Sequence, residues 1–330
     1  MNSEINRKVK SLGLFSGGLD SMLAVQVLLE QKIGVTGISF TSPFFGSEQA
    51  IKAAKEIGIP LIVSDITRKL LPIIKNPKHG YGANLNPCID CHALMIREAG
   101  KIMEEEGYDF IFSGEVYYQR PMSQTKNSLL LVAKLSGYED FLLRPLSAKY
   151  LPETRPEKSG LVDRKRLLDI EGRSRKRQIE LSKNYGFKEF ASPSGGCLLT
   201  DRNFSRRLKE IFTYEKNCSA KDLELLKVGR HFRIYRKKVV VGRDEKENQV
   251  LKKRAENNDV LLSAEHVPGP VTLVCGGGSD RLIKKAASIC ARYSKAKNDS
   301  ILPVIYKMGD SIEKIIPPAI KEDEIDSLRI

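Results

Sequence analysis

Two groups of residues in this sequence have the types and spacing to do chemistry. The first is the stretch SGGLDS, which begins at Ser16 between an apolar run and a helical pattern. Gly17 and Gly18 allow a sharp turn close to a phosphate, Ser21 adds a second hydroxyl, and the helix start directs free N–H groups at the anion. Because Asp20 would repel a phosphate directly, we expect it to act through Mg²⁺. The stretch predicts a phosphate-binding loop, but it lacks the GK[ST] of a Walker loop.

The second group consists of three cysteines. Cys88 and Cys91 form a CxxC pair in NPCIDCH, and Cys197 lies far along the chain in the glycine-rich turn of PSGGCLLTD. Structural zinc normally has four Cys or His ligands, and His92 would point away from the pair if a helix begins there. Three thiolates leave one iron of a [4Fe-4S] cluster open to an exchangeable ligand such as sulfide. A persulfide route between two cysteines and structural zinc are the alternatives.

Length and composition indicate an ordinary globular protein with two domains. The chain has 330 residues, of which 41% are hydrophobic and 29% charged, and this length exceeds what one core usually organises. Neither a signal-type apolar segment at the amino end nor an 18-residue apolar run is present. We therefore expect a cytoplasmic protein without membrane contact, in which six cysteines serve as ligands or redox groups rather than disulfides.

Positive charge is concentrated in the second half of the chain. The net charge is +14, and 17 Lys or Arg face 7 Asp or Glu between Arg202 and Arg254. Such clustering suits a polyanion, because each neutralised phosphate releases a counterion. The basic segment EGRSRKRQIE at 171–180 is expected to be a solvated helix face, although a face turned toward tRNA would use the same residues. The sequence does not predict an oligomeric state.

The order of elements predicts a doubly wound α/β domain followed by a smaller α+β domain. Apolar runs at 10–16, 35–41, 60–66, 110–115 and 141–147 indicate strands, and helical patterns lie between them. This rhythm predicts a mostly parallel sheet that binds ligands outside the carboxyl ends of its strands. We expect a catalytic domain at 1–150, a basic connector at 151–227 that completes the site with Cys197, and a third region at 228–330.

Region 228–330 has its own pattern of strands and helices. A hairpin is expected at 231–244, strands at 259–265 and 270–277, a helix at 280–296 and a last strand at 301–307. The glycine run at 276–278 precedes the helix and is expected to be a turn. These elements predict the small α+β domain.

The SGGLDS loop resembles the PP-loop of the ATP pyrophosphatase superfamily. A second stretch, FIFSGEVYYQRPMSQT, is similar to a signature of the tRNA 4-thiouridine synthetase family, and LRPLS at 143–147 resembles its next strand. The positions that match are Ser113, Gly114, Glu115, Gln119, Ser123, Gln124 and Thr125. The resemblance implies that ATP is split between its α and β phosphates, with Mg²⁺, to adenylate a uridine oxygen. It places Gly114 and Gln124 on the adenylate and substrate side.

The resemblance also bears on the cysteines and on the product. CxxC with a distant third cysteine resembles the iron–sulfur branch of tRNA thiolation enzymes, which implies that Cys88, Cys91 and Cys197 carry a [4Fe-4S] cluster. A sulfur donor, sulfide or a persulfide carrier, is then required. We expect 4-thiouridine as the product, with 2-thiouridine, or amide and amidine formation, as alternatives. The family's usual ferredoxin-like and THUMP RNA-binding region is not found before the loop, so another region must bind tRNA.

The carboxyl-terminal 100 residues resemble the RNA-binding domain of NFACT proteins. The marks of this resemblance are VGRDEKEN, the VPGP that follows His266, and the AA…YSKA pattern. Arg243, Lys252, Lys253 and Arg254 offer phosphate contacts, and His266 offers stacking or hydrogen bonding to a base. A hypothesis of another class is that the chain is a non-catalytic RNA- or ribosome-binding adaptor with a degenerate ATPase fold. An intact SGGLDS together with three cysteines argues against it.

Overall fold

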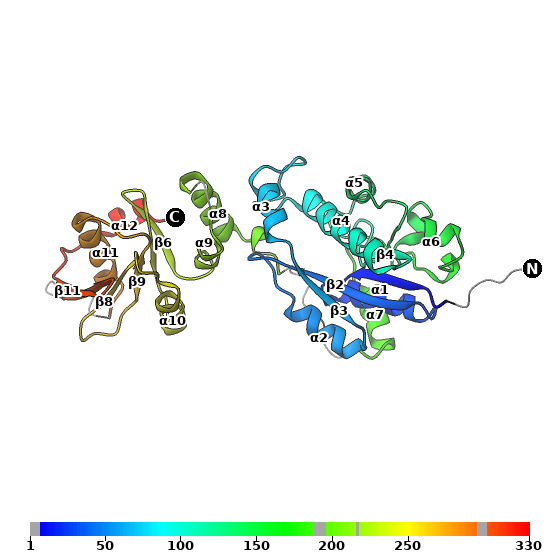
Figure 1. Cartoon of the computed structure of the whole chain (residues 1–330), viewed down its shortest axis with the longest axis horizontal. Helices are drawn as coiled ribbons and strands as arrows, with labels where there is room; N and C mark the ends of the chain where they lie inside the picture. The colour runs from blue at the N-terminus through cyan, green and yellow to red at the C-terminus, as the bar shows by residue number, and fades with distance from the viewer. Residues whose placement is uncertain (1–6, 188–189, 191–195, 216–217, 296–301) are drawn as a thin grey trace, which may run out of the picture. The chain divides into compact units, whose positions relative to one another are not determined.

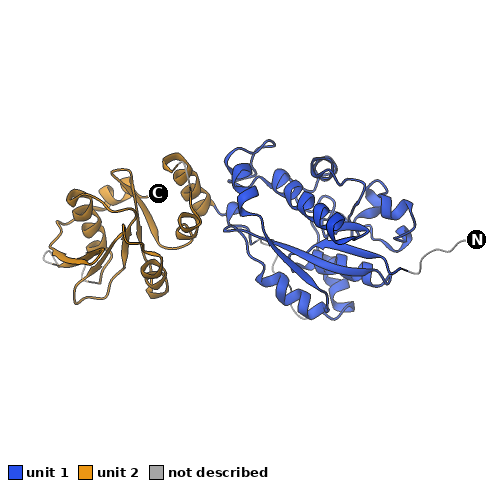
Figure 2. Ribbon diagram, in the orientation of Figure 1, with its two compact units in different colours: residues 1–201 blue, residues 202–330 orange. Residues whose placement is uncertain are grey.

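The chain folds into two compact units. The computed structural model describes residues 7–187, 190, 196–215, 218–295 and 302–330. Residues 1–201 form unit 1 and residues 202–330 form unit 2 (Figure 2). The boundary lies inside the expected connector 151–227, so the part with Cys197 belongs to unit 1 and the remainder to unit 2. Within the described ranges, no helix is long and apolar enough to cross a membrane.

Unit 1 is built on a sheet of five parallel strands. Their spatial order is β3-β2-β1-β4-β5, and the strands span Lys10–Leu14 (β1), Gly34–Thr41 (β2), Leu61–Asp65 (β3), Phe110–Ser113 (β4) and Leu142–Leu143 (β5). Every pair in this sheet is parallel. The predicted doubly wound parallel sheet is therefore confirmed. The strand expected at 141–147 is shorter than predicted, because Pro145, which has no N–H to donate, follows it closely.

The chain reverses its direction of winding between β1 and β4. After β1 the chain adds β2 and β3 on one side, and then returns to place β4 against the other side of β1, where Leu12 pairs with Ile111. Ligands of doubly wound sheets bind at this switch point, beyond the carboxyl ends of the strands. The SGGLDS loop follows β1, and the SGE stretch follows β4. The topology therefore brings both sequence motifs to one place.

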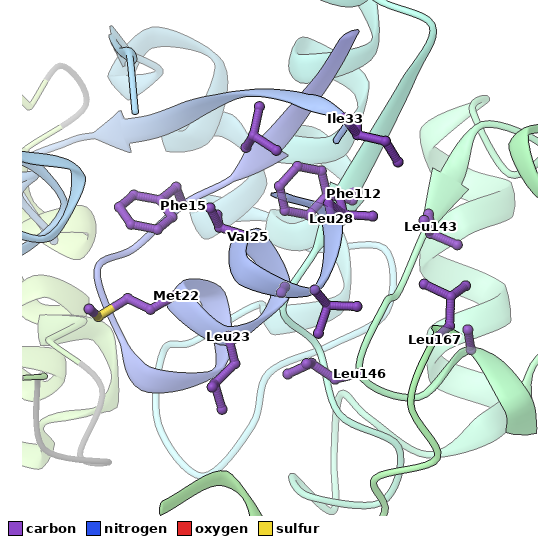
Figure 3. Packing of buried hydrophobic residues seen from close by; sticks show 14 of the residues in the cluster. Phe15, Met22, Leu23, Val25, Leu28, Ile33, Phe112, Leu143, Leu146 and Leu167 are labelled. Carbon is purple, nitrogen blue, oxygen red and sulfur yellow. The ribbon is translucent and has the colours of Figure 1, made fainter. Parts of the chain in front are cut away.

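Helices cover both faces of this sheet. Figure 1 shows α3, α4 and α5 on one face and α2 and α7 on the other. The helices of unit 1 span Leu19–Leu29 (α1), Glu48–Ile57 (α2), Thr67–Lys75 (α3), Cys88–Glu106 (α4), Lys126–Ser136 (α5), Arg155–Lys158 (α6) and Lys176–Asn184 (α7), with 3₁₀ turns at Ala148–Tyr150, Arg164–Arg166 and Leu198–Thr200. Helix α1 is buried on most of its surface. It packs in the core with Phe15 and Phe112 (Figure 3).

Two helices of unit 1 differ from the sequence prediction. Helix α3 was not predicted, and it contains Pro72, a residue that normally argues against a helix interior. Helix α4 begins at Cys88 rather than after the CxxC pair. Pro87 stands at the N-cap of α4, a position where the absence of an N–H is well tolerated. Cys88 and Cys91 are therefore three residues apart on the first turn of a helix and share one side of it.

Unit 2 contains a six-stranded antiparallel sheet with the order β11-β10-β8-β9-β7-β6. Its strands span Arg230–Ile234 (β6), Lys237–Val241 (β7), Val260–Ala264 (β8), Thr272–Val274 (β9), Val304–Met308 (β10) and Ser311–Ile315 (β11). Its helices span Arg202–Tyr214 (α8), Ala220–Leu225 (α9), Glu245–Arg254 (α10), Asp280–Arg292 (α11) and Glu322–Leu328 (α12). The smaller α+β domain is confirmed.

Details of unit 2 differ from the prediction at its end. Strand β10 is not the last, because the turn at Gly309 (φ +59°) leads into β11. Strand β11 was missed because its solvated sequence SIEKI shows little of the apolar pattern that marks a strand. The ends expected at 296 and 301 lie outside the described residues.

A substitution at Gly114 tests the close contact at the switch point. In Gly114→Ala the new Cβ would lie 2.6 Å from the Ser21 nitrogen and 2.7 Å from the Asp20 carbonyl. We expect the free energy of unfolding of unit 1 to fall by about 1–3 kcal/mol, since neither backbone segment can yield easily. Urea unfolding measures this change. Gly196→Ala is the control, because its Cβ would meet nothing within 4 Å. Equal losses of unfolding free energy in both variants would contradict the close contact of Gly114 with α1.

Candidate active site at the switch point of the parallel sheet

The SGGLDS loop is held by its own backbone and hydroxyl groups. Gly17 has φ +73°, and a Cβ there would lie 2.3 Å from the Gln49 carbonyl oxygen, so only glycine fits. The Ser21 hydroxyl donates to the Gly18 carbonyl at 2.8 Å, and the Gly18 N–H donates to Ser16 Oγ at 3.3 Å. The two serine hydroxyls are 3.4 Å apart. The four residues expected to bind phosphate thus form one compact turn at the start of α1.

Asp20 lies on the first turn of α1 and has one carboxylate oxygen without a partner. Gln119 Nε2 donates to Asp20 Oδ2 at 2.7 Å, whereas the buried Oδ1 has no hydrogen-bond partner in the part of the chain that the structure describes. Burial raises the pKa of this carboxyl, and the Gln119 amide and the Arg175 and Arg120 guanidinium groups oppose the rise. An unsatisfied buried carboxylate oxygen suits a hard cation such as Mg²⁺. The role of Asp20 at Mg²⁺ stays a prediction.

A relay of amides connects Asp20 to helix α7. Gln178 Nε2 donates to Gln119 Oε1 at 2.9 Å, and Gln119 in turn donates to Asp20. Gln178 is fully buried, and neither its own Oε1 nor the buried Nε of Arg175 has a hydrogen-bond partner among the residues that the structure describes. Sequence reasoning missed both residues, because EGRSRKRQIE was expected to be a solvated face. That expectation is wrong at Gln178, and the segment carried no signal for its burial, because Ile179, its one apolar residue, is exposed.

The stretch after β4 forms a tight loop that carries Gln124. The Tyr118 N–H donates to the Gln124 carbonyl at 2.7 Å, and the Gln124 N–H donates to the Arg120 carbonyl at 3.0 Å. Gln124 is buried, and its Oε1 has no hydrogen-bond partner within the described ranges. Gly114 instead contacts the backbone of α1, so close packing explains that glycine directly. The loop thus adds a third buried oxygen that is open to a donor.

A fully paired network stands on the other side of Gly114. Glu115 accepts hydrogen bonds from Arg144 Nε at 2.9 Å and from the Ser113 hydroxyl at 3.0 Å, and it lies 3.0 Å from His92 Nδ1. Although burial raises the pKa of Glu115, Arg144 and His92 together hold it well below its ordinary value. Since His92 is engaged with Glu115, its Nδ1 does not face the cysteines. This network fixes the end of β4 against α4 and the end of β5.

The three cysteines come from two distant segments and lie near one another. The thiols of Cys88 and Cys197 are both within electrostatic reach of Cys91. Burial raises the pKa of Cys91 strongly, and burial likewise raises the pKa of Cys197 to about 11. Asn86 Nδ2 donates to Cys88 Sγ at 3.2 Å. Among the described residues, however, no group of three or more His, Cys, Asp or Glu side chains is arranged to hold a single metal ion.

The segment of Cys197 is tied to the same edge of the sheet. The Leu198 N–H donates to the Phe44 carbonyl at 2.9 Å just after β2, and Asn84 Nδ2 donates to the Thr200 carbonyl at 2.8 Å. Arg120 is within electrostatic reach of both Asp20 and Cys197. The glycine-rich turn expected before Cys197 begins at 193–195, which lie outside the described residues. The SGGLDS loop, which follows β1, and the segment of Cys197, which is bonded to the chain just after β2, therefore lie at the same edge of the sheet.

In unit 2, some of the residues expected to contact RNA form ion pairs within the protein and others do not. Arg243 is paired with Glu247, and Arg254 lies 3.5 Å from Glu224. Lys252 and Lys253, on the last turn of α10, form no ion pair with any described residue. His266 has φ +57°, and its side chain is 86% exposed. The side chains of Arg243 and Arg254 are still 50% and 40% exposed, so Lys252 and Lys253 differ from them in having no ion pair among the described residues.

Two family models match separate parts of the chain. Residues 7–149 match the model described as "Thiamine biosynthesis protein (ThiI)", and residues 229–329 match the model described as "NFACT protein RNA binding domain". Both resemblances read from the sequence are confirmed. Helix α7 and Cys197 lie outside both matches. A comparison with curated proteins gave no match.

Similarities to solved structures cover parts of this chain. A 4-thiouridine synthetase in complex with RNA and bound ATP is 27% identical with a TM-score of 0.33, over 42% of this chain and 36% of that chain. A predicted tRNA methyltransferase subunit from Methanocaldococcus jannaschii is 20% identical with a TM-score of 0.31, over 42% and 69%. The C-terminal part of a fibronectin/fibrinogen-binding protein from Streptococcus suis is 13% identical with a TM-score of 0.28, over 73% and 100%. This chain therefore spans little more than a third of the length of that 4-thiouridine synthetase.

The Glu115 network predicts a specific dependence of stability on pH. Because the pKa of Glu115 in the folded state lies below its ordinary value of 4.5, its contribution is present above pH 4.5 and is lost as the pH falls further. We expect Glu115→Gln to be less stable at pH 7 by about 3 kcal/mol and to lose less stability than the unmodified protein on acidification. Urea unfolding at several pH values measures both. Glu105→Gln, at an exposed position, is the control. If Glu115→Gln lost as much stability on acidification as the unmodified protein, Glu115 would not be the group that causes the loss.

Proposed function

We propose that this chain, which joins a ThiI-type domain to an NFACT-type RNA-binding domain, is an ATP-dependent sulfurtransferase that thiolates a uridine of tRNA. One observation carries the proposal. The SGGLDS loop follows β1, and the Leu198 N–H, next to Cys197, donates to the Phe44 carbonyl just after β2, so the loop and the thiols gather at the same edge of the sheet. An adaptor without catalysis would have no need to bring these groups together. The RNA-binding match favours RNA over a small acceptor, such as a thiamine precursor, for the sulfur.

In the first step the uridine oxygen attacks the α-phosphorus of ATP, and pyrophosphate leaves. The turn of Ser16, Gly17, Gly18 and Ser21 binds the phosphates through backbone N–H and hydroxyl groups at the start of α1. Asp20 Oδ1 is the free acceptor that would hold Mg²⁺, which shields the charge of the leaving group. Gln124, with its open Oε1, lies in the loop on the substrate side. Burial of this edge excludes water, which would otherwise hydrolyse the adenylate.

In the second step a sulfur nucleophile attacks the activated carbon, and AMP leaves with the former uridine oxygen. Cys88, Cys91 and Cys197 fit a [4Fe-4S] cluster in donor type and number, and a bound cluster would supply an open iron for sulfide. Tetrahedral Zn²⁺ would need its sulfurs about 3.8 Å apart, and the described thiols are not arranged for a single ion. The chain's part is to keep the three sulfurs together near the adenylate. Transfer by a cysteine persulfide is the second route that the same thiols support.

The modified nucleoside tests this function. We expect a strain without the gene to lose 4-thiouridine from its tRNA, and the unmodified gene to restore it. Cys197→Ser should restore less than about a hundredth of the thiolation, because the third thiol is missing, while ATP binding persists. Liquid chromatography with mass spectrometry of tRNA nucleosides measures this.

The controls separate the alternatives. Cys218→Ser, in unit 2, should behave like the unmodified protein. Loss of 2-thiouridine instead of 4-thiouridine would show that the C2 carbonyl of uridine is the one thiolated. An unchanged nucleoside profile would favour the adaptor hypothesis. Protein purified without oxygen should be brown and contain iron. A colourless protein that still thiolates tRNA would contradict the cluster and favour transfer by a cysteine persulfide.

Contacts to RNA should depend on the unpaired lysines of α10. We expect Lys252→Ala with Lys253→Ala to weaken tRNA binding and to lower the slope of log affinity against log salt by about 2, because two phosphate contacts are lost. Filter binding at several salt concentrations measures the slope. Lys284→Ala with Lys307→Ala removes the same charge elsewhere on unit 2. An equal loss in both pairs would contradict a specific role for α10.

A further inference from the structure

We propose that Arg175 and Gln178, at the start of α7, bind the Mg²⁺-pyrophosphate portion of ATP. This inference rests on the ATP-dependent reaction proposed above and adds residues that lie outside the matched span 7–149. Arg175 precedes α7, and Gln178 lies on its first turn. Both carry a buried polar atom without a hydrogen-bond partner among the described residues, and Gln178 is linked to Asp20 through Gln119.

Packing alone does not explain the orientation of α7. Gln178 is 0% exposed, whereas its apolar neighbour Ile179 is 42% exposed. Hydrophobic burial would favour the reverse arrangement, because an amide loses hydrogen bonds to water on burial and an aliphatic chain does not. A buried amide next to an exposed isoleucine indicates that this side of α7 is selected for polar contact with the site.

The amide relay fixes which atom of Gln178 faces the site. A carboxylate only accepts, so Gln119 must direct its NH₂ group at Asp20 and its oxygen at Gln178. Gln178 must then direct its own NH₂ group at Gln119. Its Oε1 is left as a buried acceptor without a partner. Together with Asp20 Oδ1, it offers two oxygens to the donors of a hydrated cation.

Arg175 offers the complementary charge. Arg175 is the N-cap residue of α7, three residues before Gln178, and its buried Nε has no hydrogen-bond partner among the described residues. An unpaired guanidinium nitrogen beside an unpaired amide oxygen that is linked to Asp20 suits a ligand that carries both signs. The magnesium complex of pyrophosphate is such a group: its oxygens would accept from Arg175, and Asp20 and Gln178 would hold its cation side.

Binding measurements separate this role from the rest of the nucleotide site. We expect Arg175→Ala and Gln178→Leu to weaken binding of Mg²⁺-ATP and of Mg²⁺-pyrophosphate about 10- to 100-fold, as the loss of a charge-assisted contact implies. AMP lacks the β and γ phosphates, so its affinity should change less than about 2-fold. Isothermal titration calorimetry of the full chain with each ligand measures the three affinities, and circular dichroism checks that the variants are folded.

Arg177→Ala is the matched control, because Arg177 lies on the same turn but pairs with Asp169 at the surface. Unchanged Mg²⁺-pyrophosphate affinity in Arg175→Ala would overturn the proposal, and so would an equal loss of AMP affinity. Retention of about a third of the affinity in Arg175→Lys would support a charge contact. A chain that binds Mg²⁺-ATP with this dependence but thiolates no tRNA would overturn only the function proposed above.

Discussion

The close contact between the end of β4 and the first turn of α1 is the constraint on which the site depends. Gly114 lies so near the Asp20 and Ser21 backbone that no side chain fits there. This contact is possible because β1 and β4 are neighbours at the point where the winding of the sheet reverses. It places the loop that carries Gln119 directly over Asp20. Two motifs separated by about a hundred residues of sequence thereby act as one unit.

The two buried polar networks on either side of Gly114 differ in how completely their polar atoms are hydrogen-bonded. Around Glu115, the carboxylate has partners in Arg144, Ser113 and His92, as a buried charge requires. In the site of Asp20 and the adjoining loop and helix, four buried atoms have no hydrogen-bond partner among the described residues, namely one oxygen each of Asp20, Gln124 and Gln178 and the Nε of Arg175. Each such atom costs about 1–3 kcal/mol when left unsatisfied. A fold that satisfies one network fully and leaves its neighbour open is arranged to receive a polar ligand there.

Much of unit 1 could be predicted because its signals are local. Continuous apolar runs indicated the parallel strands, and the SGGLDS and SQT stretches indicated the loops after β1 and β4. The contribution of α7 could not be predicted, because which face of a basic helix is buried depends on tertiary contacts with α1. The start of α4 at Cys88 was missed because the CxxC pair was taken as a loop motif, whereas Pro87 makes it a helix start. Strand β11 was missed because both its faces are largely solvated.

Net charge from sequence overstated how much of the basic surface is available for RNA. In unit 2, Arg233 is committed to Glu210, Lys221 to Asp259 and Arg243 to Glu247, so these cations would have to give up a partner to contact a phosphate. Such an exchange gains little, because a contact inside the protein is lost for each one formed with the nucleic acid. Lys252 and Lys253 form no ion pair with a described residue, so a phosphate contact there costs only hydration and side-chain entropy. The pattern of pairing, rather than the formal charge of +14, therefore decides where unit 2 can bind an anion.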